Sequence, residues 1–168
     1  MRRTRVIPVL LIKGKGLYKT KKFKNPIYLG DPINAVKIFN DKGVDEIVIL
    51  DIERKGGGGA VNFDYISKFV DECFMPMSYG GGIVAISQAR RLFRLGVEKC
   101  IINSAVHQSP EFVKNLVGEF GGQSIVVSMD VRKKLFSKNM VFVHCGLKNT
   151  KVSPVDYARR AEDLGAGE

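Results

Sequence analysis

The sequence is poor in the residues that form disulfide bonds and metal sites. In 168 residues it has three cysteines, two histidines and no tryptophan. The cysteines, Cys73, Cys100 and Cys145, are far apart and form no CxxC pair, which argues against a disulfide framework and against a zinc site. His107 and His144 are too few for a metal site, and we expect both to be structural. The sequence therefore predicts no metal and no other cofactor.

Long apolar runs are also missing. No run reaches the roughly 18 residues that a membrane span requires. The basic start at residues 1–5 is followed by an apolar run that ends at Lys13, which is too short for a signal peptide. We therefore expect a cytoplasmic globular protein with no membrane contact.

Negative charge is in short supply, since 27 lysines and arginines stand against 17 acidic residues and give a net charge of +10. Such an excess is typical of nucleic-acid binders and of proteins that handle acidic or phosphorylated ligands. Six lysines fall within residues 13–24, which we expect to form a loop. Only Tyr18 and Phe23 are aromatic there, fewer than a base-stacking surface usually offers. A solvated loop or an anion site is favoured, and no nucleic-acid partner is expected.

Short apolar runs alternate with helical patterns along the whole chain. The predicted strands cover residues 5–12, 46–52, 76–79, 99–102 and 124–131, and the predicted helices cover residues 31–42, 63–73, 86–95, 109–120 and 153–165. Three of the helices begin with an Asp or Ser followed by proline, a favoured way to start a helix. Strands without an alternating polar face, linked by helices, predict an α/β fold with a covered parallel sheet.

An internal repeat separates a barrel from a doubly wound sheet. Residues 31–37 (DPINAVK) match residues 153–159 (SPVDYAR), and Gly43 and Glu46 match Gly165 and Glu168 at the same spacing. The strands ahead of these segments, residues 6–13 and 125–132, also correspond. The first and fifth βα units therefore look like copies, which predicts a duplicated half barrel and thus a TIM-type (βα)8 barrel.

Only about five of the eight units are present. A complete barrel of this type has about 250 residues, whereas this chain ends at Glu168, where the repeat predicts a sixth strand to begin. We expect residues 1–168 to form a single partial TIM-barrel domain with strands one to five and helices one to five. Strands one and five would then offer unpaired edges, and these edges predict a homo-oligomer.

The motifs along these units are shared with one enzyme family. They lie in residues 5–19, 30–32, 44–46, 50–52, 80–83, 96–99, 102–105, 128–130 and 165–168. With them the sequence resembles the cyclase subunit of imidazole glycerol phosphate synthase. The segments 9–17 and 19–25 resemble a side branch found with surface-polysaccharide (lipopolysaccharide) biosynthesis genes, whose members are thought to supply ammonia for sugar amidation.

The resemblance implies a partner and an entrance for ammonia. In the family, a glutaminase subunit releases ammonia at the amino-terminal face of the barrel, where four charged residues surround the entrance. The matching positions are Arg5, Glu46, Lys99 and Glu168, each at the start of a strand. The alternative is that these residues are ion pairs that tie the bottom of the barrel together.

The resemblance also implies a phosphorylated small-molecule ligand. Gly81 and Gly82, within a run of three glycines after the third strand, match a family phosphate site together with Asn103 and Ser104. Glycines let a backbone approach an anion closely, although a flexible turn would carry the same residues. Lys19 matches a lysine of the family's substrate loop, and Asp51 matches a residue that faces the substrate.

One catalytic position departs from the family. Its cyclase reaction uses two aspartates, at the ends of strands one and five, as acid and base. Asp130 fills the strand-five position, but Leu11 occupies the strand-one position, and leucine cannot transfer a proton. We therefore expect this chain alone to lack cyclase activity.

Three function hypotheses remain open at this point. The first is an ammonia conduit that feeds sugar amidation on another protein, and the second is a histidine-pathway cyclase of which this chain is a fragment. The third is a non-catalytic barrel remnant kept for association. Two further segments have structural predictions only. Residues 133–150 are expected to form a small hairpin over the top face, and Gly56–Gly59 a floppy turn.

Overall fold

The computed structural model describes residues 4–53, 61–133 and 139–168; the Gly56–Gly59 run lies outside them. Five parallel strands follow the chain order in one sheet: β1 (Val9–Lys13), β4 (Ile47–Asp51), β5 (Met77–Gly80), β6 (Lys99–Ile102) and β7 (Ile125–Val127). One row of paired residues crosses this sheet, namely Leu11, Leu50, Gly80, Ile101 and Val126. The predicted α/β fold with a parallel sheet is confirmed.

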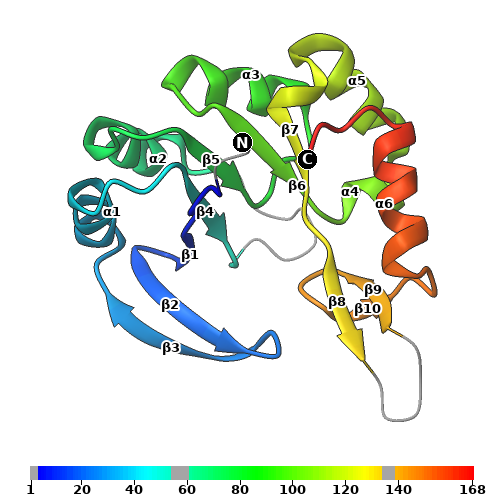
Figure 1. Cartoon of the computed structure of the whole chain (residues 1–168), viewed down its shortest axis with the longest axis horizontal. Coiled ribbons are helices and arrows are strands. Elements are labelled where there is room, and N and C mark those ends of the chain that lie inside the picture. Colours follow the sequence, from blue (N-terminus) through cyan, green and yellow to red (C-terminus); the bar gives the residue numbers. More distant parts are fainter. Residues whose placement is uncertain (1–3, 54–60, 134–138) are drawn as a thin grey trace.

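Helices cover the convex side of this curved sheet (Figure 1). They are α1 (Pro32–Asp41), α2 (Phe63–Glu72), α3 (Ile86–Leu95), α5 (Pro110–Phe120) and α6 (Pro154–Asp163), with a single turn, α4 (Ala105–Gln108), after β6. The helix starts predicted from Asp31 and Ser153 are confirmed. The Asp31 carboxylate accepts a hydrogen bond from the Ile33 backbone N–H at 2.9 Å, and the Ser153 hydroxyl accepts one from Asp156 at 3.1 Å.

The core fills the space between the sheet and the helices. Ile47 and Ile49 of β4 are fully buried there with Phe69 of α2 and Leu92 of α3. Because side chains alternate along a strand, Val48 and Leu50 point to the other, concave side, where they are only half-buried. In β4, therefore, the helix side is fully covered and the inner side is more open.

The lysine-rich segment is a hairpin and not the loop that the sequence suggested. β2 (Gly16–Lys21) turns back antiparallel on β1, and β3 (Lys24–Gly30) pairs with β2. Gly14, at φ +57°, lies in the turn between β1 and β2. Tyr18 and Thr20 alternate with Lys19 and Lys21, a pattern that suits a strand. The high density of lysines made this pattern hard to recognise in the sequence.

The predicted fifth strand is also divided. Its first part is β7, and the chain leaves the main sheet at Ser128 before forming β8 (Asp130–Lys133). β8 pairs antiparallel with β9 (Asn139–Val143), which pairs with β10 (Lys148–Asn149). The small hairpin predicted over residues 133–150 is therefore confirmed, and it begins earlier than expected because β8 is one of its strands.

Both outer parallel strands are partly paired within the chain. β2 covers residues Leu11–Lys13 of β1, and the segment after α6 runs beside β7, where the Val127 N–H donates to the Glu168 carbonyl at 2.8 Å. The expectation of two wholly open edges was therefore wrong for these residues. Among the helices that the structure describes, none has the length and apolar character needed to cross a membrane.

Replacement of Phe69 in α2 is expected to lower stability strongly, whereas replacement of Phe74 just beyond this helix is expected to have little effect. Phe69 is 0% exposed in the core, whereas Phe74, just beyond the helix, is 87% exposed. Phe69→Ala should lower the free energy of unfolding by about 3–5 kcal/mol because it leaves a cavity. Phe74→Ala, the matched control, should change it by less than about 0.5 kcal/mol. Urea denaturation measures both, and equal effects would contradict this description of the core.

Candidate functional site

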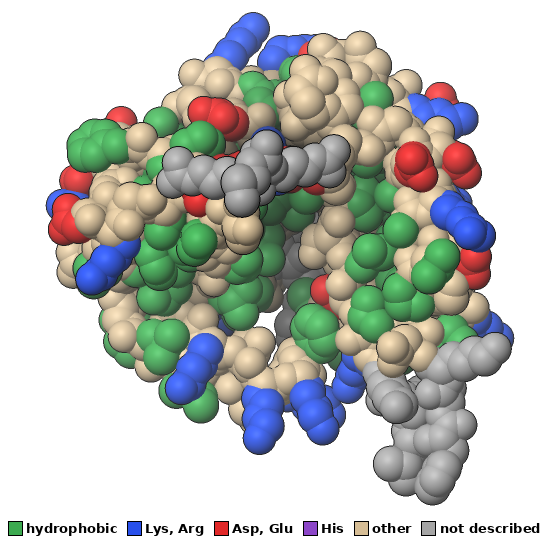
Figure 2. Space-filling view, in the orientation of Figure 1, with side chains coloured by type: hydrophobic (Ala, Val, Ile, Leu, Met, Phe, Trp, Pro, Cys, Tyr) green, Lys and Arg blue, Asp and Glu red, His purple; other side chains and the backbone are tan. Residues whose placement is uncertain are grey.

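A cavity of about 630 Å³ lies at the carboxyl ends of the parallel strands. Figure 2 shows the hollow in the middle of the molecule, with hydrophobic side chains on its wall and lysine side chains along the rim that the β2–β3 hairpin forms. The ends of β1, β4, β5 and β6 contribute to its lining, together with Asp130 at the start of β8. Because parallel strands bring their carboxyl ends to one edge, residues far apart in the chain meet here.

Six residues predicted for the site line this cavity: Asp51, Gly81, Gly82, Asn103, Ser104 and Asp130. The glycine run needs its residue type for a steric reason. Gly81 has φ +126°, and a Cβ atom there would lie 2.6 Å from the Asp51 carbonyl oxygen. Only glycine allows β5 to turn away so close to the end of β4.

Asn103 and Ser104 are held by hydrogen bonds at the end of β6. The Asn103 amide donates to the Ser128 carbonyl at 3.0 Å, and the Ser104 hydroxyl donates to the Asn103 side-chain oxygen at 3.1 Å. The Tyr157 hydroxyl of α6 donates to the Asn103 carbonyl at 3.2 Å. Burial raises the pKa of Tyr157 to about 12, so the hydroxyl remains a donor at neutral pH.

Asp130 is an acidic residue that lines the same cavity as Asn103 and Ser104. Burial raises the pKa of its carboxyl group, although hydrogen bonds from the Gly146 backbone and the Asn103 side chain oppose the shift. A carboxyl group with a raised pKa is better suited to holding or donating a proton than an exposed aspartate. The geometry therefore gives Asp130 the means for acid–base chemistry.

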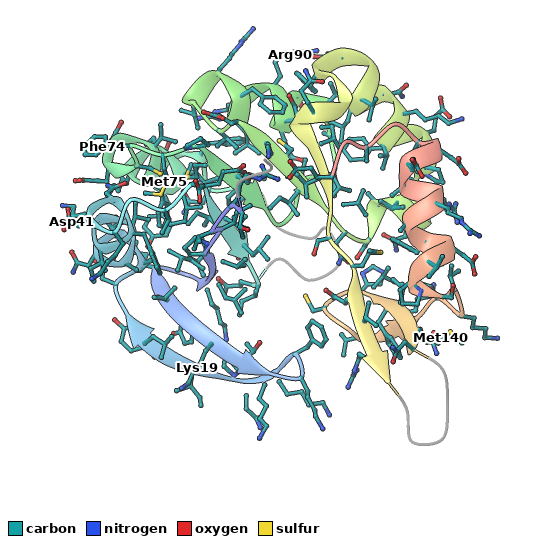
Figure 3. The ribbon with its side chains drawn as sticks, in the orientation of Figure 1. Lys19, Asp41, Phe74, Met75, Arg90 and Met140 are labelled. Atoms are coloured by element: carbon teal, nitrogen blue, oxygen red, sulfur yellow. The ribbon has the colours of Figure 1, made fainter. Side chains whose placement is uncertain are left out.

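Leu11 lines the same cavity from the end of β1, paired with Leu50 and with Tyr18. β1 itself contributes no carboxylate here, but the Glu53 carboxylate, from beyond the end of β4, reaches this strand end and accepts a hydrogen bond from the Gly14 N–H at 2.9 Å. Lys19, in contrast, lies outside the cavity lining. Its side chain is exposed and points away from the hollow (Figure 3), while its neighbour Thr20 faces the cavity. This difference follows from the alternation of side chains along β2.

The four predicted charged residues form a closed ring at the opposite, amino-terminal end of the strands. Arg5 contacts Glu46 and lies 3.3 Å from the Glu168 carboxylate. The Lys99 ammonium lies 3.1 Å from the Glu46 carboxylate and 2.8 Å from that of Glu168. Each positive group therefore touches both negative groups, and the charges alternate around the ring.

The ring is partly buried, so each of its charges needs a partner of opposite sign. Glu46 is only 8% exposed. Burial opposes the positive charge of Lys99, but the hydrogen bonds that Lys99 donates to Glu168 and Glu46 outweigh it, and the pKa of Lys99 is raised. The Lys99 hydrogen bond likewise lowers the pKa of Glu168. Buried charges are tolerated when they are paired in this way.

Several lining residues were not identified from the sequence. Thr20 and Phe23 reach the cavity because their segment is a hairpin, and Gln108, His144 and Cys145 reach it from α4 and from the turn after β9. The antiparallel additions place all of these residues there except Gln108, which lies on α4. His144, which the sequence suggested to be purely structural, is among them, whereas His107 is not.

The described part of the chain offers no group of three or more histidine, cysteine, aspartate or glutamate residues arranged to hold a metal ion. Cys73, Cys100 and Cys145 form no disulfide bond within the described residues. Burial raises the pKa of Cys100 to about 12, which keeps that thiol protonated and unreactive.

Comparisons with known proteins agree with this geometry. Residues 5–168 match the model of a family described as histidine biosynthesis protein. The chain is 45% identical over 168 residues to a Pseudomonas aeruginosa protein provisionally named imidazole glycerol phosphate synthase subunit hisF2. It is 47% identical over 169 residues to the similarly named hisF3 of Vibrio vulnificus and 44% identical over 169 residues to a HisF subunit of Leptospira interrogans.

These matches cover 100% of this chain but 67%, 65% and 66% of the three relatives, so the chain spans about two thirds of their length. The family match includes every parallel strand, the ring at one end of them and the cavity at the other. The chain therefore belongs to the histidine biosynthesis protein family.

Proposed function

We propose that this chain acts as the cyclase-type subunit of a glutamine amidotransferase pair, in which a glutaminase partner delivers ammonia at the charged ring. The names of the relatives, subunits of imidazole glycerol phosphate synthase, support a subunit role. The ring and the cavity lie at opposite ends of the same five strands. This arrangement suits a molecule that enters at one end and reacts or leaves at the other.

The ring is suited to a controlled entrance because its charges neutralise one another. Two acidic and two basic groups alternate, and Lys99 contacts both carboxylates. Val48 and Leu50 follow Glu46 on the inner side of β4. A neutral molecule such as ammonia passes along an apolar wall more readily than an ion does. The entrance at the ring would therefore favour ammonia over ions.

The cavity is the proposed site for a phosphorylated ligand. Gly81 and Gly82 expose backbone at the end of β5, next to Asn103 and Ser104 at the end of β6. Such exposed backbone and small polar groups hold phosphate oxygens. The exposed Lys19 and its neighbouring lysines on the hairpin would attract an anion to the rim.

Leu11 is the observation that carries the conduit hypothesis. Leu11 lines the cavity from β1, at the position where the family has its second catalytic aspartate. At this position β1 therefore supplies no proton-transferring group. With an intact ring and an incomplete acid–base pair, the subunit would pass ammonia on and not use it itself. We propose sugar amidation in polysaccharide biosynthesis as the reaction that consumes this ammonia.

A histidine-pathway cyclase is the second candidate, because one observation favours it. Asp130 is retained in the cavity, and its raised pKa suits proton donation. A cyclase in which Asp130 carries the proton transfers alone remains compatible with that residue. The two candidates make different predictions about turnover.

The conduit hypothesis predicts that the chain activates a cognate glutaminase through the ring. Light scattering should show a 1:1 complex, and glutamine hydrolysis should be faster with the chain than without it. Lys99→Met removes contacts to two carboxylates, and it should lower this activation by about ten-fold, as expected for loss of charge-assisted hydrogen bonds.

Arg90→Ala is the matched control for this experiment. It also removes a cation paired with a glutamate, Glu119 at 2.7 Å, but on the outer helices α3 and α5. Activation should be unchanged in this variant. Equal losses in the two variants, or no activation by the wild-type chain, would rule out the ring as the entrance.

Leu11 predicts that the chain does not cyclise substrate. Supplied with ammonia and the bisphosphorylated substrate of imidazole glycerol phosphate synthase, the wild-type chain should form no cyclised product above background in a chromatographic assay. Leu11→Asp restores the missing carboxyl group and should add activity only if the rest of the site is complete. Measurable turnover by the wild-type chain that is lost in Asp130→Asn would favour the cyclase over the conduit.

The ring also predicts a pH dependence of stability. The pKa of Glu168 is lowered from 4.5 by Lys99, so its ion pairs stabilise the fold above pH 4.5 and are lost as the pH falls through the lower folded value. The stability advantage of wild type over Glu168→Gln should therefore be present at neutral pH and shrink in acid. Asp130 titrates in both proteins and cancels in this difference. An advantage that persists in strong acid would show that the ion pairs do not form.

A further inference from the structure

The turn that follows β9 has an unusual backbone. His144, Cys145 and Gly146 have φ angles of +56°, +56° and +75° in succession. Left-handed backbone is unfavourable for residues with a side chain, and it persists where surrounding contacts enforce it. His144 and Cys145 both line the cavity. The strained segment therefore lies directly against the proposed ligand site.

Contacts from several other elements hold this turn in place. The His144 backbone N–H donates to the Ser104 hydroxyl at 3.0 Å, and the Arg132 guanidinium donates to the Gly146 carbonyl at 2.5 Å. The Phe23 ring of the β2–β3 hairpin packs against Gly146, since a Cβ atom on that glycine would lie 3.0 Å from Phe23 Cδ2. The position of His144 is thus fixed from β6, β8 and the hairpin together.

The imidazole of His144 has one engaged nitrogen and one that is accessible. Its Nε2 lies 2.7 Å from the Gln108 side-chain nitrogen, which can only donate. The Nε2 atom therefore accepts, and the proton of a neutral ring resides on Nδ1. Among the described residues, only His107 has a buried side-chain nitrogen without a partner, and no contact engages Nδ1 of His144. This nitrogen is therefore an available donor at the cavity.

An anionic ligand in this cavity needs such donors. The cavity carries three carboxylates, Asp51, Glu53 and Asp130, against one lysine, Lys13, among its described lining residues. Neutral donors must therefore supply much of the attraction for a phosphate group. The Ser104 hydroxyl and the His144 backbone are already linked at one end of the cavity, so the imidazole lies close to the proposed phosphate site.

We propose that His144 is a ligand-binding residue, which donates a hydrogen bond from Nδ1 to an oxygen of the phosphorylated ligand held beside Ser104. Gln108 is its positioning residue, because it fixes the ring and places the proton on Nδ1. This inference rests on the proposed phosphate site and deepens it. It identifies the ligand class as a phosphate monoester that accepts hydrogen bonds from two different strand ends.

Nuclear magnetic resonance of the ¹⁵N-labelled full chain tests the proposal, because the chain has only two histidines. Ribose 5-phosphate is titrated in, with inorganic phosphate and ribose as separate arms. We expect the Nδ1 resonance of His144 to shift with both phosphate-containing probes, together with the amides of Gly81, Gly82, Asn103 and Ser104. His107, which does not line the cavity, should not shift, and ribose alone should have little effect.

Two outcomes would overturn the proposal, and they differ. Shifts of the four amides without any shift of His144 would leave the phosphate site in place and remove His144 from it. No shift of the amides or of His144 would reject the proposed phosphate site itself and the inference with it.

Affinity measurements on variants provide the second readout. His144→Ala should weaken ribose 5-phosphate binding by about ten-fold, the cost of losing one hydrogen bond to a charged group. His144→Asn keeps a polar nitrogen near the Nδ1 position and tolerates left-handed backbone, so it should retain most of the affinity. His107→Asn is the matched control and should bind as the wild type does. Unchanged affinity in His144→Ala, with a native amide spectrum, would contradict the proposal.

Discussion

The register of the five parallel strands is the constraint on which the rest of the structure depends. Leu11, Leu50, Gly80 and Ile101 are paired in one row and share one side of the sheet. The residues directly before and after each of them therefore point to the other side. Ile47 and Ile49 pack under the helices, while Glu46 and Leu50 face inward. A shift of one residue in β4 would turn Glu46 toward the apolar side chains under the helices and bring Ile47 and Ile49 to the inner side. Burial of the helix side therefore fixes the ring and the cavity at the same time.

The two ends of the strands solve different electrostatic problems. At the amino-terminal end, Glu46 is almost fully buried, and Lys99 and Arg5 compensate its charge directly. At the carboxyl end, Asp130 is partly compensated by hydrogen bonds from Asn103 and Gly146, and burial still raises the pKa of its carboxyl group. Pairing with a cation favours the ionised form of a carboxyl group, whereas burial without full compensation favours its protonated form. Carboxyl groups at the two ends are thus held in different surroundings, among cations at one end and among hydrogen-bond donors at the other.

At its outer side, the cavity is shaped by two additions to the parallel strands, the β2–β3 hairpin and the β8–β9–β10 sheet. The β2–β3 hairpin brings Phe23 against Gly146, and the β8–β9–β10 sheet brings His144 and Cys145 to the same opening. These contacts join segments more than a hundred residues apart. They also hold a left-handed turn that an isolated peptide would not keep. The shape of the cavity at this face therefore depends on the contact between the two additions.

The sequence by itself determined the parallel α/β fold, the helix starts at Asp31 and Ser153, and the membership of Asp51, Gly81, Asn103 and Asp130 in one site. The fold and the helix starts follow from local signals, because apolar runs and capping are read from neighbouring residues. The site residues were instead implied by the family resemblance, and they line one cavity. It also gave the four residues of the ring, whose closure the distances show. Only the tertiary structure decided that the lysine segment is a hairpin, that Lys19 points outward and that His144 reaches the cavity. Antiparallel register and the contacts between the hairpin and the small sheet set these positions, and neither is encoded in the spacing of residues along the chain.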